Sequence, residues 1–94
     1  MAKLDLEKIR QDIDRVDRRL AQNLEERLQL VLQVAEYKRE QGLPVKDAAR
    51  EEQVIAKVTS LLQNQDYAPA VADIMRSIIA AACVLEENFL EKNQ

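Results

Sequence analysis

The chain has 94 residues, a formal net charge of −3 and interspersed charges, so one domain spanning residues 1–94 is expected, without the basic stripe of a nucleic-acid-binding surface. Histidine is absent and Cys83 is the only cysteine, which excludes an internal disulfide, an ordinary zinc site and a nucleophile paired with histidine. No metal or cofactor is therefore expected. With no apolar run near about 18 residues and no signal-peptide pattern, we expect a cytoplasmic protein without a membrane partner.

The composition predicts an all-α protein. Aromatic residues make up only 3% of the chain, and glycine occurs once. Alanine, leucine, glutamate, glutamine, arginine and lysine dominate, and these are strong helix formers. A few long helices with short connections are the natural arrangement.

The first helix is predicted from about Asp5 to about Gln41. Gly42 is a good C-terminal stop, and Pro44 follows it. The apolar residues recur at steps of three and four, as one face of a helix requires. They are Ile9, Ile13, Val16, Leu20, Leu24, Leu28, Val31 and Val34.

Two shorter helices follow. The second is predicted from about Ala48 to Gln63, with Asp47 as its N-cap. The third is predicted from about Tyr67 to Glu91, with Pro69 in its first turn. Their apolar stripes comprise Val54, Val58, Leu61 and Leu62 in the second helix, and Val71, Ile74, Met75, Ile78, Ala82, Leu85 and Phe89 in the third.

The first helix is too long for a compact monomer. Some 37 residues at about 1.5 Å each give roughly 55 Å, whereas a chain of this size has a radius of gyration of about 12 Å. A second copy of the chain lying along this helix would cover its apolar stripe. A two-fold dimer is therefore expected, and a long antiparallel coiled coil is a simpler form of the same idea.

Charged residues lie within the apolar stripes. Successive helical residues turn by about 100°, which places Arg27 and Lys38 within the stripe of the first helix. The same reasoning puts Arg50 and Glu51 on the buried side of the second helix and Glu86 inside the apolar band of the third. Each alone is explained by a snorkelling side chain or an ion pair at the edge of the core. Together they carry a surplus of positive charge, which suggests that an anionic ligand completes a polar pocket.

Three segments resemble the all-helical, AroQ-class chorismate mutases. The segment "LEKIRQDIDRVDRRLAQNLEERLQLVLQVAEYK" is similar to that family's first helix. "GLPVKDAAREEQVIAKV" resembles its loop and second helix, and "IMRSIIAAACVLEEN" its third-helix pattern. The resemblance covers nearly the whole chain, with the motifs in order and at the right spacing.

The resemblance implies an intertwined two-fold homodimer of three-helix chains with two active sites. Each site would be built largely from one chain, and Arg10 would cross from the partner. Ala82 falls where the family usually has serine, and Glu86 where it usually has glutamine. A register one residue later would put Cys83 and Glu87 there instead. The remaining matched site positions are Arg27, Lys38, Asp47, Arg50 and Glu51.

The implied activity is rearrangement of chorismate to prephenate in aromatic amino-acid biosynthesis, which makes the chain an isomerase. The reaction needs no proton transfer and no covalent intermediate, in keeping with a catalyst that lacks histidine. Arg27 and the partner's Arg10 would bind the two carboxylates of the substrate, and Arg50 would reinforce them. Lys38 and a protonated Glu86 would donate to the ether oxygen.

Glu51 would accept a hydrogen bond from the ring hydroxyl, and Asp47 would contribute through its main chain or by capping. Three alternatives remain open. An isochorismate–pyruvate lyase shares this fold and a similar set of cations, although Glu51 favours the mutase. A helical dimerisation module would carry no catalysis. The chain could also be a mutase module cut from, or partnered with, another enzyme of the same pathway.

Overall fold

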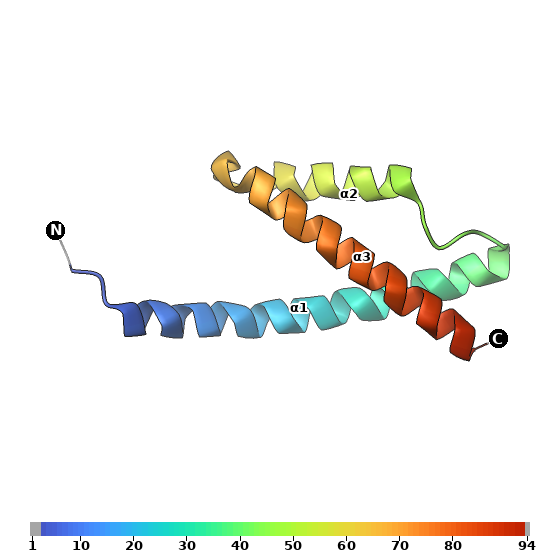
Figure 1. The fold of residues 1–94 in the computed structure, drawn as a ribbon, viewed down its shortest axis with the longest axis horizontal. Coiled ribbons are helices and arrows are strands. Elements are labelled where there is room, and N and C mark those ends of the chain that lie inside the picture. The colour runs from blue at the N-terminus through green and yellow to red at the C-terminus, as the bar shows by residue number, and fades with distance from the viewer. Residues whose placement is uncertain (1–2, 94) are drawn as a thin grey trace. The chain divides into compact units, whose positions relative to one another are not determined.

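A computed structural model describes residues 3–93, which are all-helical and contain no strand (Figure 1). Helix α1 spans Leu6–Gln41, α2 spans Ala48–Ser60 and α3 spans Ala68–Lys92. A short 3-10 helix, η1, spans Gln65–Tyr67 and leads into α3. The predicted all-α class, with three helices of which the first is long, is confirmed.

The chain divides by its internal contacts into two units, Met1–Leu30 and Val31–Gln94. The division falls inside α1, so the first unit contains most of this helix and the second contains its last turns with α2 and α3.

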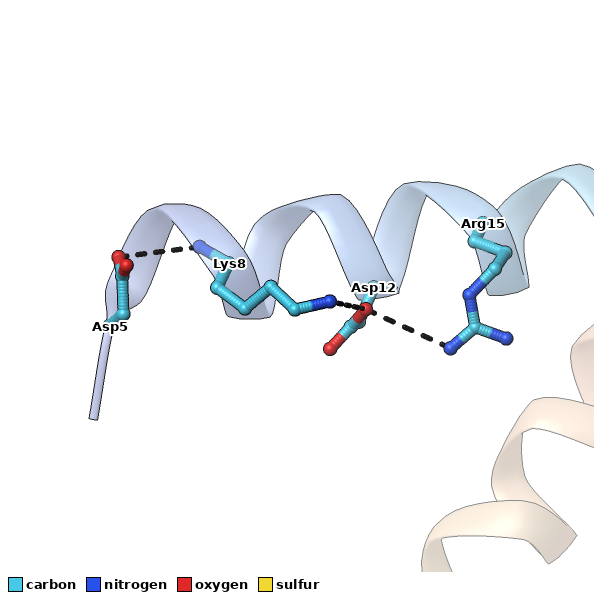
Figure 2. Close-up of polar contacts among 4 residues, drawn as sticks. All are labelled: Asp5, Lys8, Asp12 and Arg15. Carbon is cyan, nitrogen blue, oxygen red and sulfur yellow. Dashed lines mark hydrogen bonds and ion pairs between the residues drawn. The ribbon is translucent and has the colours of Figure 1, made fainter. Parts of the chain in front are cut away.

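Local interactions support the start of α1 in the first unit. The Asp5 carboxylate accepts hydrogen bonds from the main-chain N–H groups of Glu7 and Lys8, at 3.0 and 3.4 Å. One turn later the Asp12 carboxylate lies 3.1 Å from the Lys8 ammonium and 3.8 Å from the Arg15 guanidinium (Figure 2). Such exposed pairs stabilise a helix by only a few tenths of a kcal/mol each. Within the single chain, the first turns of α1 are therefore stabilised by weak interactions between residues close in sequence.

The apolar side chains of the first unit are largely exposed to solvent. Ile13 and Leu20 are about half exposed, at 52% and 49%. We call the four residues Ile9, Ile13, Val16 and Leu20 the α1 stripe; all four are exposed within the single chain. Because they repeat at helical spacing, they form one uncovered face.

Gly42 ends α1 as predicted. Its φ of 68° lies in the left-handed region, which glycine adopts at little cost. Its N–H donates to the Arg39 carbonyl at 3.3 Å, and the Leu43 N–H donates to the Lys38 carbonyl at 2.8 Å. These two bonds form a Schellman motif, so the chain turns sharply away from the helix axis.

Helix α2 begins as predicted but ends three residues early. The Asp47 carboxylate caps it by accepting the Arg50 main-chain N–H at 3.0 Å. The predicted end at Gln63 is wrong, because α2 stops at Ser60. The side-chain amide of Gln65 donates to the main-chain carbonyls of Thr59 and Leu62, at 3.0 and 2.9 Å, and so satisfies groups that another helical turn would have used.

Helices α2 and α3 form a hairpin around a small core in the second unit (Figure 1). Ile55, Met75 and Ile79 are buried at its centre. Pro69 lies in the first turn of α3, as predicted, where its missing N–H costs no hydrogen bond. Partly buried side chains complete the packing, namely Val54, Val58, Val71, Ala72 and Ile78.

The segment Gln65–Lys92 is long and apolar enough to cross a membrane, judged by length and composition alone. An 18-residue window within it has a mean hydropathy of 1.7. The expectation that no such segment exists is therefore wrong, because only Asp73 and Arg76 carry charge between Tyr67 and Leu85. A single helix of this kind is weak evidence for a membrane, since core helices of soluble proteins share these properties.

Candidate active site

Six of the eight predicted site residues belong to the second unit. Arg10 and Arg27 belong to the first, where Arg10 is exposed and Arg27 is half-buried. The six come from the end of α1, the loop after it, the start of α2 and the second half of α3. They are Lys38, Asp47, Arg50, Glu51, Ala82 and Glu86.

Lys38 lies in the last turn of α1 and is half-buried. Its ammonium group donates a hydrogen bond to the Val45 main-chain carbonyl at 2.6 Å. An ammonium carries three donors, so two of them remain after this bond. The side chain is thus held by the loop while it keeps donors for another acceptor.

Glu86 is the buried acid of α3. Its side chain is only 7% exposed, and its Oε2 has no hydrogen-bond partner among residues 3–93. Burial raises the pKa of this carboxyl, the Lys38 ammonium opposes that rise, and the Glu87 carboxylate adds to it. A raised pKa extends the pH range over which this carboxyl keeps its proton, and only the protonated form can donate a hydrogen bond.

Glu51 of α2 is a second carboxyl without a partner. It is half-buried, and its Oε2 is buried with no hydrogen bond among the described residues. Burial raises the pKa of the Cys83 thiol, and the charges of Glu86 and Glu51 raise it further, while Lys46 opposes them. One thiol on α3 therefore lies within the electrostatic reach of both carboxyl groups.

Glu51 of α2 and Glu86 of α3 thus both act on the pKa of the same thiol, that of Cys83. Both acids have an oxygen that can still bind a hydroxyl group or another polar group. The described residues hold no cluster of three or more groups suited to a metal ion.

Arg50 does not lie where its rotation on the helix predicted. Its side chain is exposed, as is that of Asp47, whereas Glu51 is half-buried. Arg50 is in the first turn of α2, ahead of the core that begins near Ile55, so the prediction that it is on the buried side is wrong for the single chain. The Asp47 carboxylate is engaged by the helix cap.

The second half of α3 directs Glu86 inward and Glu87 outward. Ala82, one turn before Glu86, is only 4% exposed, whereas Glu87 is exposed and Cys83 is half-buried. This burial pattern favours the register that assigns Ala82 and Glu86 to the site over the register one residue later.

Two features near Lys38 were not found by sequence reasoning. The acceptor for its ammonium is the main-chain carbonyl of Val45, and a main-chain group carries no residue-type signal. The neighbouring Arg39 donates to the main-chain carbonyl of Asn93 at 2.8 Å and pairs with Glu36, which ties the last turns of α1 to the end of α3. The only sequence signal for the Arg39 contacts was the position of this arginine directly after Lys38.

Comparisons with known proteins agree with the motifs. The sequence model of a family described as "Chorismate mutase type II" matches residues 9–87, which contain all eight predicted site residues. A "Chorismate mutase" of Methanocaldococcus jannaschii is 28% identical over 90 residues, which cover 95% of this chain and 91% of that protein.

Two longer relatives are each described as "Bifunctional chorismate mutase/prephenate dehydratase". The one from Aquifex aeolicus is 31% identical over 88 residues, and the one from Buchnera aphidicola is 29% identical over 92 residues. The match covers 88% and 97% of this chain respectively, but only 24% of each relative. The chain therefore spans about a quarter of the length of these bifunctional relatives. The match to the family model confirms the predicted resemblance.

The raised pKa of Glu86 predicts how stability depends on pH. Because folding raises this pKa above its ordinary value of 4.5, the folded state binds the proton more tightly than the unfolded state does. Ionisation therefore costs stability as pH rises through the raised pKa. Glu86→Gln cannot ionise, so its free energy of unfolding should exceed that of the wild type at neutral pH.

The advantage of Glu86→Gln should shrink below about pH 4, where the carboxyl is protonated in both states. Urea unfolding at a series of pH values measures the difference. Glu52→Gln, on an exposed position of α2, should show no comparable change with pH. An equal stability difference between wild type and Glu86→Gln at every pH would contradict the prediction.

Proposed function

Because the chain belongs to the chorismate mutase type II family, we propose that it rearranges chorismate to prephenate by electrostatic and conformational catalysis. The observation that carries the proposed mechanism is a lysine and a buried acid in the second unit, each with hydrogen-bonding capacity left over. The Lys38 ammonium keeps donors free, and the buried Glu86 carboxyl has a raised pKa and an oxygen without a partner.

The chemistry requires donors and a shaped site. One C–O bond breaks as one C–C bond forms within the same molecule, and no proton leaves or enters. The catalyst must hold the chair-like conformer and stabilise the charge that develops on the ether oxygen. In our proposal, Lys38 donates to this oxygen from α1 and a protonated Glu86 donates from α3.

Glu51 accepts a hydrogen bond from the ring hydroxyl of the substrate in this proposal. Its unpartnered Oε2 supports the assignment, because a buried acceptor costs free energy unless a donor reaches it. The same assignment favours a mutase over an isochorismate–pyruvate lyase. A purely structural dimerisation module would have no use for two unpartnered carboxyl groups.

The arginines provide the cationic side of the site. Arg27 and Arg10 of a second copy bind the two substrate carboxylates, and the exposed Arg50 reinforces them. Guanidinium groups suit this task because they bind carboxylates with two parallel hydrogen bonds. Asp47 acts mainly by capping α2, which fixes the position of Glu51 one turn later.

The site requires a second chain, and we propose an intertwined two-fold homodimer. The exposed α1 stripe supports this, since burial of each large aliphatic side chain contributes roughly 1.5–3 kcal/mol. The exposed Ile74 and Val84 of α3 add apolar surface that a partner would cover. Arg10 is on the same helix as the stripe, so the contact that buries the stripe would also deliver Arg10 to the partner.

Lys38→Ala should lower turnover by roughly 100-fold to 1000-fold, which is the usual cost of losing one donor to a developing oxyanion. The assay follows loss of chorismate, with prephenate identified as the product. Lys57→Ala, on an exposed position of α2, is the matched control and should keep wild-type turnover. Near-normal turnover of a folded Lys38→Ala enzyme would refute the role of Lys38.

Turnover should be highest under acidic conditions and fall as Glu86 ionises, because only its protonated form donates. Glu86→Gln retains an N–H donor and cannot ionise, so it should stay active and flatten the alkaline fall. Glu86→Ala should be poor at every pH. The measurement is a pH–rate profile of the three proteins, and identical profiles for wild type and Glu86→Gln would exclude Glu86 as the donor.

Mixing two inactive variants tests the shared site. In a heterodimer of Arg10→Ala and Lys38→Ala, one site contains both defects and the other contains neither. After subunit exchange at equal concentrations, roughly a quarter of the wild-type activity should return, because half of the dimers are mixed and each has one intact site. Proven exchange without recovery would count against Arg10 crossing between chains.

A further inference from the structure

The loop after α1 contacts Lys38 at two points. The Lys38 main-chain carbonyl accepts the Leu43 N–H at 2.8 Å, and its side-chain ammonium donates to the Val45 carbonyl at 2.6 Å. A lysine side chain has four rotatable bonds and loses up to about 2 kcal/mol of rotamer entropy when it is fixed. These contacts bring the two ends of one residue to the same short segment, which restricts where the ammonium can lie.

The loop is itself constrained along its length. At its start, Gly42 with its φ of 68° directs the chain out of α1. Pro44 has a fixed φ and also restricts Leu43, the residue before it. At its end, Asp47 caps α2. The Val45 carbonyl is therefore presented to Lys38 by a segment anchored on both sides.

The Lys38–Val45 contact bears on the surroundings of Glu86, because Lys38 is one of the charges that act on the pKa of that carboxyl. Within residues 3–93 the Lys38 ammonium is bound to Val45 and makes no ion pair with Glu86, whose Oε2 stays unpartnered. Two charges act on the pKa of Glu86: Lys38 from α1 lowers it, and Glu87 from the same helix raises it. Burial raises this pKa by more than Lys38 lowers it.

Cys83, one turn earlier on α3, interacts electrostatically with Glu86 and with Glu51 of α2. Lys38 is the one cation among the described residues that acts on the pKa of Glu86. A movement of its ammonium group would therefore change the protonation of Glu86 directly. If the ammonium reached the carboxyl, the two groups would satisfy each other, and the carboxyl would give up its proton.

We propose that the loop Gly42–Val45 is a positioning element, which holds the Lys38 ammonium short of an ion pair with Glu86 so that both groups remain donors to the substrate. This inference rests on the proposed function for its catalytic consequence. Its structural part, the separation of the two groups by the loop, can be measured without any reaction.

The test loosens the loop without touching either donor. Pro44→Gly frees the main chain between Leu43 and Val45, and Pro44→Ala does so less. The ammonium can then move toward Glu86. We expect the turnover number to fall on the order of 10-fold, since small misplacements of catalytic groups have large effects on rate, with a smaller change in KM. The alkaline fall of the pH–rate profile should move to lower pH.

Three controls isolate the effect. Gln63→Gly also adds main-chain freedom, but to the other connection, between α2 and η1, and should leave turnover and the pH profile unchanged. In a Glu86→Gln background, Pro44→Gly should no longer shift the profile, because position 86 cannot ionise. In a Lys38→Ala background, Pro44→Gly should cause no further loss of turnover. All variants are compared after urea unfolding shows that they are folded.

A direct readout separates this inference from the proposed function. The pKa of Glu86 is measured by following its carboxyl carbon by NMR across a pH titration without substrate. Pro44→Gly should lower this pKa relative to the wild type, whether or not chorismate is the substrate. An unchanged Glu86 pKa in folded Pro44→Gly, or a profile shift that persists with Glu86→Gln, would overturn the positioning role. Failure of the wild type to consume chorismate would count against the proposed function alone.

Discussion

Burial of the Glu86 carboxyl is the constraint on which the candidate site depends. An ionised carboxylate without a partner costs several kcal/mol when it is removed from water. The core of the second unit is small, with Ile55, Met75 and Ile79 at its centre, so it has little stability to spare for such a group. Burial raises the pKa of this carboxyl, and protonation would remove the charge and make the acid a hydrogen-bond donor. Glu86 is therefore explained better by chemistry than by folding, as is usual where a local rule is broken at a functional site.

The same local motifs that end one helix and begin the next also position two residues of the proposed site. The Schellman turn at Gly42 directs the chain back past Lys38, and the Asp47 cap fixes the first turn of α2, which carries Glu51. Each motif contributes about 1 kcal/mol or less to the helix itself. Their larger effect is geometric, because the proposed rearrangement, which involves no proton transfer, would depend on donors held in fixed positions.

The sequence predicted those features that depend on residue type. Helical periodicity predicted α1 and α3, Gly42 and Asp47 predicted two helix ends, and three motifs predicted the family. The end of α2 was missed because Leu61 and Leu62 continue the apolar spacing after the backbone has left the helix. The Val45 carbonyl was missed because a main-chain acceptor looks the same at every residue. The exposure of Arg50 was missed because the helical rotation predicts the direction of a side chain, but not whether another segment covers that side of the helix.

The uncovered apolar surfaces of the two units call for one explanation. A membrane would account for the apolar length of α3, but α1 offers it only a narrow stripe flanked by charged residues such as Lys8, Asp12 and Arg15. A second copy of the chain would bury apolar residues of both helices, including Ile13 on α1 and Ile74 on α3. It would also add Arg10 to Arg27 and Arg50, the other arginines of the proposed site for a dicarboxylate substrate. A second copy would then both bury the exposed apolar residues and complete the proposed substrate site, which is why we favour the dimer.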